Sequence, residues 1–284
     1  NFPNLALMKI SAYHKARGDQ VEWAIPMLKY DIVYQSKVFD FTHDENISIQ
    51  CDQLIKGGTG YDLDNKLPKE IEGIYPDYSL YNVKKAYGFL TRGCPRNCSF
   101  CIVGKKEGLI SVQVAELRQF WKEQNEIKLL DPNITASKEC DRLFKDLIDS
   151  KVWIDFTQGI DIRFMTEKRA EMLNEMKIKM IHFAWDNYEF NTYEKLKKFR
   201  PLLKFDGRKL RVYVLTNFNT TIEQDLERIY KLKELDYDPY VMVYDKQNAS
   251  KKIRELQRWV NNKFIFRSCE RFEDYKKVDV KCQL

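Results

Sequence analysis

From residue 85 onward, the chain alternates short apolar runs with amphipathic stretches, and this alternation constrains its fold more than any other feature. The apolar runs are near-continuous and rich in β-branched or aromatic residues, which is typical of strands buried on both faces. Strands are expected at residues 85–90, 127–130, 152–158, 179–185, 210–216 and 240–244. Helices are expected at residues 112–124, 138–150, 166–176, 191–199, 221–235 and 250–262.

The expected strands recur about every 25 to 40 residues, which is the length of a βαβ unit. Six such units in series predict an α/β fold with a parallel sheet, which right-handed crossovers would curl into a barrel or part of one. A doubly wound sheet has the same local pattern, so the spacing alone leaves both architectures open.

Three cysteines, Cys94, Cys98 and Cys101, lie within eight residues directly after the first expected strand. Parallel α/β sheets place their chemistry at this end of a strand. Three thiolates can hold a cubane iron–sulfur cluster and leave its fourth iron open. Structural zinc would need a fourth ligand close by, whereas the next candidates downstream are Cys140 and His182. The cysteines therefore predict an iron–sulfur cluster.

The C-x₃-C-x₂-C pattern, with Phe100 directly before its last cysteine, resembles the motif of the radical SAM superfamily. The resemblance implies a [4Fe–4S] cluster on Cys94, Cys98 and Cys101, and S-adenosylmethionine (SAM) on the open iron. It implies cleavage of SAM to a 5′-deoxyadenosyl radical that abstracts hydrogen from a substrate, which the sequence does not identify. It also implies a partial (β/α)₆ barrel, contact of Phe100 with the adenine, and an electron donor such as flavodoxin or ferredoxin.

Polar residues after the second expected strand are the first candidates for holding SAM. Asp131 and Asn133 occupy the place of the superfamily's Gly-Gly-Glu motif, and their oxygens suit an ammonium group. The glycines of that motif are missing here. A simple turn explains the Asp-Pro-Asn sequence equally well.

The third and fourth strands supply the remaining candidates. Gln158, Asp161 and Arg163 alternate with apolar residues at the expected end of the third strand. Asp161 could accept from ribose hydroxyls and Arg163 could hold a carboxylate, or the two could simply pair with each other. Asp186 follows the fourth strand and suits a hydroxyl contact, although a helix N-cap would also account for it.

The segment before the barrel is a separate region. Residues 4–17 predict a helix, residues 20–24 and 31–34 short strands, and residues 57–60 a glycine-rich turn. Residues 1–66 resemble an incomplete Rossmann-like, cobalamin-domain-like segment, but the Asp-x-His-x-x-Gly cobalamin motif is absent, so cobalamin is not expected. A linker at 67–84, a barrel at 85–262 and a C-terminal tail at 263–284 complete the predicted domains.

The composition limits which binding partners are expected. A net charge of +6 permits nucleic-acid binding without indicating it, and no apolar run is long enough for a membrane span. Seven cysteines, three of them in one cluster motif, suit the reducing cytoplasm. The alternative function is a non-catalytic iron–sulfur or electron-transfer module on an α/β scaffold, which would supply a fourth protein ligand to the cluster.

Overall fold

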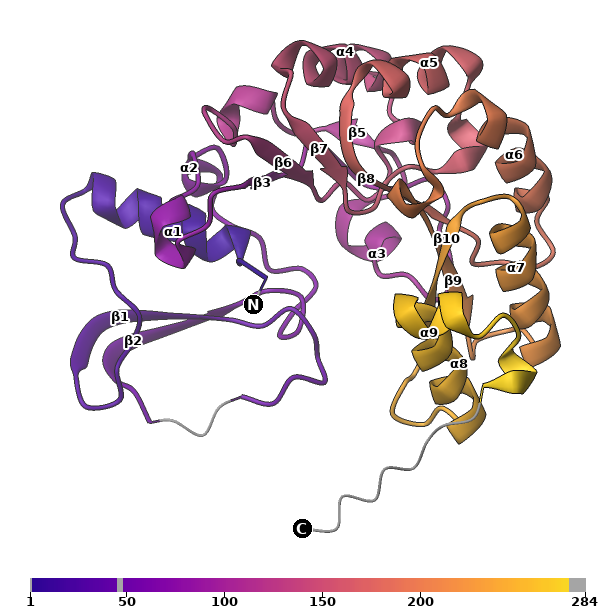
Figure 1. Ribbon diagram of the computed structural model, residues 1–284. Coiled ribbons are helices and arrows are strands. Elements are labelled where there is room, and N and C mark those ends of the chain that lie inside the picture. Colours follow the sequence, from indigo (N-terminus) through magenta and orange to yellow (C-terminus); the bar gives the residue numbers. More distant parts are fainter. Residues whose placement is uncertain (1, 45–47, 276–284) are drawn as a thin grey trace. The chain divides into compact units, whose positions relative to one another are not determined.

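Parallel strand ladders with intervening helices form most of the computed structural model, which describes residues 2–44 and 48–275 (Figure 1). The last part of the predicted tail, including Cys282, lies outside the described residues. The chain divides into two compact units, Asn1–Asp146 and Leu147–Leu284. This division falls at none of the expected domain boundaries, and the division into segment, linker and barrel stays a prediction.

The first unit begins with a helix and a two-stranded parallel ladder. Helix α1 (Leu5–Ala16) starts at Asn4, whose side chain accepts a hydrogen bond from the Leu7 amide. Strands β1 (Lys29–Ser36) and β2 (Gln50–Gly57) pair in parallel, and the short helices α2 (Lys69–Glu72) and η1 (Tyr78–Tyr81) follow. The expected strand at 20–24 is wrong: these residues form no ladder, because most of the segment is exposed and Trp23 bonds to the Leu80 carbonyl instead.

The rest of the first unit contains the three cysteines of the C-x₃-C-x₂-C motif. Strand β3 (Ala86–Gly88) pairs in parallel with β6 (Glu126–Leu129), and β4 (Thr91–Arg92) pairs antiparallel with β5 (Val112–Gln113). Helix α3 (Val103–Glu107) lies between β4 and β5, while η2 (Leu117–Gln119), η3 (Ile134–Ala136) and α4 (Cys140–Ser150) flank β6 in the sequence.

The helix expected at 112–124 is wrong. Val112 pairs with Arg92 in a β-ladder, so the start of the segment is not available to a helix, although Leu117, Phe120 and Trp121 further along are buried. A capping box between Glu116 and Gln119 then starts only a short 3₁₀ turn.

The second unit is a four-stranded parallel ladder in the order β7 (Trp153–Phe156), β8 (Lys177–Ala184), β9 (Leu210–Thr216) and β10 (Asp238–Val243). Its main helices are α5 (Glu167–Glu175), α6 (Thr192–Phe199), α7 (Ile222–Glu234), α8 (Lys251–Asn261) and α9 (Lys263–Ser268). The short helices are η4 (Ile162–Phe164), η5 (Arg200–Leu202), η6 (Gly207–Lys209) and η7 (Phe272–Asp274).

Hydroxyl N-caps and a buried core explain why these helices and strands form. Thr166, Thr221 and Ser250 each accept a main-chain hydrogen bond at the start of α5, α7 and α8, as N-caps do. Val241 of β10 packs with Ile229 of α7 and Trp259 of α8 in a buried cluster, and the helices lie along the strands (Figure 1). The prediction of an α/β fold with parallel strands is therefore confirmed, while closure into a partial barrel stays a prediction.

In the part of the chain that the structure describes, no helix combines the length and the apolar character needed to cross a membrane.

Candidate functional site: the cysteine loop and two groups of polar residues

The cysteine loop, residues 93–111, is closed at its base by the β4–β5 ladder, in which Thr91 pairs with Gln113 and Arg92 with Val112. Gly93 begins the loop at φ +89°, and a Cβ there would lie 2.1 Å from the Ile110 carbonyl oxygen. The two ends of the loop therefore approach so closely that only glycine fits at this position.

Hydrogen bonds shape the interior of the loop. The Cys94 amide donates to the Gly108 carbonyl at 3.1 Å, and the Cys101 amide donates to the Cys98 carbonyl at 2.9 Å. Between them, Asn97 has a left-handed backbone with φ 44°, a conformation that asparagine tolerates better than most residues. The Glu107 carboxylate accepts from Arg92 at 3.0 Å and from the Gly93 amide at 3.2 Å, which ties the end of α3 to the base of the loop.

The three cysteines of the loop are half-buried thiols and form no disulfide. Their number, softness and spacing fit an iron–sulfur cluster. Among the residues that the structure describes, no three His, Cys, Asp or Glu side chains lie close enough together to hold a metal ion. The donor set thus fits the cluster in its chemistry, while its side chains are not gathered around one point. Phe100 lies half-buried directly before Cys101.

Asn133 joins the end of β6 to the cysteine loop. Its Nδ2 donates to the Cys94 sulfur at 3.4 Å, and its carbonyl accepts from the Ser111 hydroxyl at 2.7 Å. Its Oδ1 accepts from the Ala136 amide at 3.2 Å, so it also caps η3. The interpretation of Asn133 as a turn residue is therefore confirmed. The structure shows in addition that Asn133 contacts the cysteine motif. That Asn133 binds SAM stays a prediction.

Asp131 is fully buried and holds the main chain just before the cysteine loop. Its carboxylate accepts from the Leu90 amide at 3.1 Å and from both the amide and the hydroxyl of Thr91, the latter at 2.7 Å. Burial raises the pKa of Asp131 to about 6, and these hydrogen bonds counteract part of that rise. In this structure Asp131 is a positioning residue, and that it binds SAM stays a prediction.

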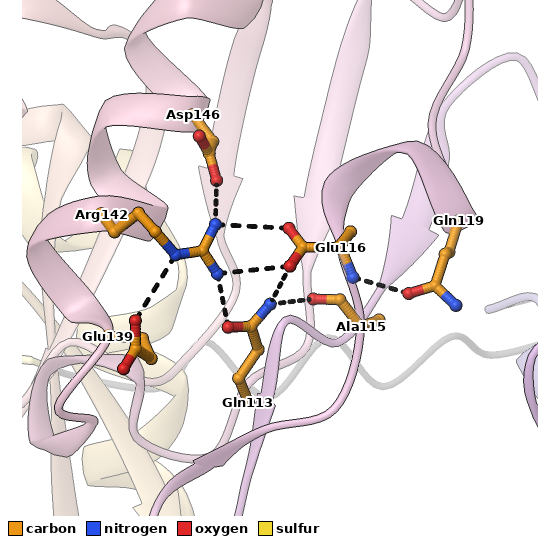
Figure 2. Close-up of polar contacts among 7 residues, drawn as sticks. All are labelled: Gln113, Ala115, Glu116, Gln119, Glu139, Arg142 and Asp146. Atoms are coloured by element: carbon orange, nitrogen blue, oxygen red, sulfur yellow. Dashed lines mark hydrogen bonds and ion pairs between the residues drawn. The ribbon is translucent and has the colours of Figure 1, made fainter.

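Arg142 of α4 ties that helix to the strand that closes the loop, as Figure 2 shows. Its guanidinium lies 3.3 Å from Glu116 and also donates to Gln113, the residue that pairs with Thr91. Within α4 it pairs with Asp146 at 2.9 Å and with Glu139 at 3.4 Å. The sequence offered no signal for this role, because a charged helix residue is usually solvated surface.

The predicted residues of the second unit form a group of their own. Arg163 donates from Nε and Nη2 to the two oxygens of Asp161 at 2.6 and 2.9 Å, so the internal pair is confirmed. These residues are not on a strand, since β7 ends at Phe156 and Asp161 caps η4. Gln158 lies exposed before the turn at Gly159, whose φ is +93°.

Asp186 follows β8 and is half-buried. Among the described residues its carboxylate makes no hydrogen bond or ion pair, and it does not cap α6, whose N-cap is Asn191. Burial raises the pKa of Asp186 to about 6, while the charges of Arg228 and Arg163 act to lower it. The structure thus brings Asp161, Arg163 and Asp186 within electrostatic reach of one another.

Arg228 of α7 is fully buried, and its role was not predicted. It donates to the carbonyl of Trp185 at 2.5 Å and to that of Leu215 at 2.7 Å, and it pairs with Asp225 at 2.6 Å. It therefore fixes the carboxyl ends of β8 and β9 next to Asp186. The sequence signal for this role was Asp225 and Arg228, a charged pair three residues apart on a largely apolar helix face.

No protein-family model matches the chain, and no match is found among curated proteins. Solved structures that resemble it include the following two. One is the radical SAM methyltransferase TsrM from Kitasatospora setae with cobalamin and a [4Fe–4S] cluster bound, at 14% identity and TM-score 0.47, covering 55% of this chain and 36% of that chain. The other is Streptococcus suis SuiB bound to SAM, at 15% identity and TM-score 0.42, covering 73% of this chain and 53% of that chain. The chain spans about a third of the first structure and half of the second.

Proposed function

We propose that this chain is a radical SAM enzyme that binds a [4Fe–4S] cluster through Cys94, Cys98 and Cys101. The observation that carries the proposal is the cysteine loop itself: three thiols of one motif lie on a loop that the antiparallel β4–β5 ladder closes, shortly after the parallel strand β3. Three protein ligands leave one iron of a cubane cluster open to a small molecule.

When bound, the cluster supplies the single electron that cleaves SAM to methionine and a 5′-deoxyadenosyl radical. The chain's own residues hold its ligands in place. Asn133 donates to the Cys94 sulfur, and hydrogen bonds of this kind tune and orient a metal ligand. Asp131 holds the main chain of Leu90 and Thr91, from which the loop departs.

Recognition of SAM would fall mainly to polar side chains that follow the strands of the second unit. Asp186 is the best candidate for its hydroxyl or amino groups, because its carboxylate makes no hydrogen bond among the described residues. Arg163 would hold the SAM carboxylate, with Asp161 orienting its guanidinium. Gln158 and Phe100 complete the proposed contacts. The substrate and the electron donor are not identified by these residues.

Anaerobic reconstitution of the full chain with iron and sulfide tests the first part of this proposal. Four irons per chain are expected, and Cys98→Ser should lose most of them. Cys51→Ser is the matched control, because Cys51 is also a half-buried thiol but lies on β2, outside the motif. Equal iron loading in both variants would contradict cluster binding by the loop.

Incubation of the reconstituted protein with SAM and dithionite tests the second part. The proposal expects 5′-deoxyadenosine, measured by liquid chromatography, in the wild type and in Cys51→Ser. A chain that loads four irons but forms no 5′-deoxyadenosine would instead be the non-catalytic iron–sulfur module.

A further inference from the structure

A cavity of about 220 Å³ lies within the first unit, lined by residues of α1, α2, the end of β3 and the segment after β5. A cavity of about 150 Å³ holds a benzene molecule. This one therefore has room for a single ring with a small polar group attached. None of its lining residues belongs to the cysteine loop or to the predicted SAM contacts.

One part of the lining is aromatic and firmly packed. Phe120 is 3% exposed and lies against Gly88, where a Cβ would come within 2.3 Å of its ring. Phe89 is the neighbouring aromatic residue, and the Arg92 guanidinium lies 4.0 Å from the centre of its ring. This part of the cavity suits the flat apolar body of a ligand.

The other part of the lining carries an excess of positive charge. Lys9, Lys69 and Glu72 all line the cavity, and the Glu72 carboxylate is shared between Lys9 at 3.3 Å and Arg92 at 3.7 Å. Within the described part of the chain, Lys69 makes no ion pair. Lys9 also donates to the main-chain carbonyl of Glu72. Burial lowers the pKa of Lys9, and Glu72 acts to raise it.

We propose that this cavity binds a small carboxylic acid with a flat apolar body. The carboxylate faces the ammonium groups of Lys9 and Lys69, and the body lies against Phe89 and Phe120. A neutral amide of the same shape lacks the charge that these lysines recognise. Inorganic phosphate has the charge but no apolar body. This site does not depend on the cluster or on SAM.

Calorimetric titration of benzoate into the full chain, with benzamide and inorganic phosphate as comparison probes, tests the proposal. Benzoate should bind with a Kd of roughly 1 mM, and each comparison probe should bind about tenfold more weakly, as expected for the loss of one charge-assisted contact or of the apolar contact. Lys69→Gln should weaken benzoate binding by about tenfold. Lys66→Gln is the matched control, because Lys66 is an exposed lysine three residues away and does not line the cavity.

Ala115→Leu adds a test that leaves every charge in place. Ala115 lines the cavity, so a larger side chain there should fill it and abolish benzoate binding. Equal affinity for benzoate and benzamide would overturn the proposal. Benzoate binding that survives both Lys69→Gln and Ala115→Leu, or that is absent at roughly 10 mM ligand, would overturn it as well.

Discussion

The polar residues that follow the strands play different parts in the two units. In the first unit, Asp131 and Asn133 are buried, and their side chains bond to the main chain or to Cys94. In the second unit, Asp161 and Arg163 bond to each other, and Asp186 is half-buried without a hydrogen bond among the described residues. The same sequence signal, a polar residue after a buried strand, marks scaffold in one unit and an accessible carboxylate in the other.

The difference has a physical consequence. A buried group whose hydrogen bonds are all internal stabilises the fold, and its removal leaves several donors without a partner. A group that keeps polar atoms available contributes little to the fold and can contribute to binding. Substitutions in the first unit should therefore cost stability, whereas substitution of Asp186 should cost ligand affinity.

The largest effect is expected for Asp131→Ala. The substitution leaves the buried amides of Leu90 and Thr91 and the Thr91 hydroxyl without their acceptor, which should lower the free energy of unfolding by about 3 kcal/mol. Urea denaturation of the apo-protein measures this change. Asp131→Asn is the control, because it keeps one side-chain oxygen and should cost less. A loss below about 1 kcal/mol in the alanine variant would contradict the scaffold role.

The raised pKa of Asp131 predicts a pH dependence of stability. The carboxyl has its usual pKa of 3.8 in the unfolded chain and about 6 in the folded protein, so the folded state holds the extra proton between these values. The stability from this group is complete below about pH 4 and is lost as the pH rises through about 6, by roughly 2 to 3 kcal/mol.

Urea denaturation at several pH values between about 4 and 7 measures this loss. Asp186 adds a loss in the same range, so the wild type is compared with Asp131→Asn, in which only the Asp131 contribution is missing. If the two proteins lose the same stability over this range, the raised pKa of Asp131 is ruled out as its cause.

An intermediate effect is expected at the start of the cysteine loop. Gly93→Ala places a Cβ 2.1 Å from the Ile110 carbonyl oxygen at φ +89°, so the backbone has to move, at a cost of about 2 to 3 kcal/mol. Gly108→Ala is the matched control, because φ is +93° there and nothing lies within 4 Å of the added Cβ, which leaves only the backbone strain of about 1 kcal/mol. Hydrogen exchange of residues 93–111 should rise only in Gly93→Ala. Equal exchange in both variants would show that the close approach does not hold the loop.

No loss of stability is expected for Asp186→Asn. This substitution breaks no hydrogen bond among the described residues and removes a charge whose burial is unfavourable, so the free energy of unfolding at pH 7 should rise and not fall. Its SAM affinity, measured by anaerobic equilibrium dialysis of the reconstituted protein, should fall about tenfold. Unchanged affinity would place Asp186 outside the cofactor site.

The parallel strands β3 and β6 to β10 were predictable because each is an apolar run bounded by polar turns, whereas β2, β4 and β5 were not predicted. The segment at 112–124 was not predictable, since its pairing with Thr91 and Arg92 depends on residues about 20 positions away. For the site, the sequence indicated the cysteines, whose spacing is local. It could not indicate that Asn133 contacts Cys94, 39 positions earlier, or that Arg228 is buried against two strand-end carbonyls. These roles arise from tertiary contacts, which a charged or amide side chain in the sequence does not predict.

The proposed function is tested most directly by the electron paramagnetic resonance spectrum of the reduced, reconstituted protein, recorded with and without SAM. Three cysteine ligands on the cluster and SAM on the fourth iron predict a single cubane signal that changes when SAM is added. This signal should be missing in Cys98→Ser. A cubane signal that SAM leaves unchanged would show that no iron is open to the cofactor and would contradict the proposed function.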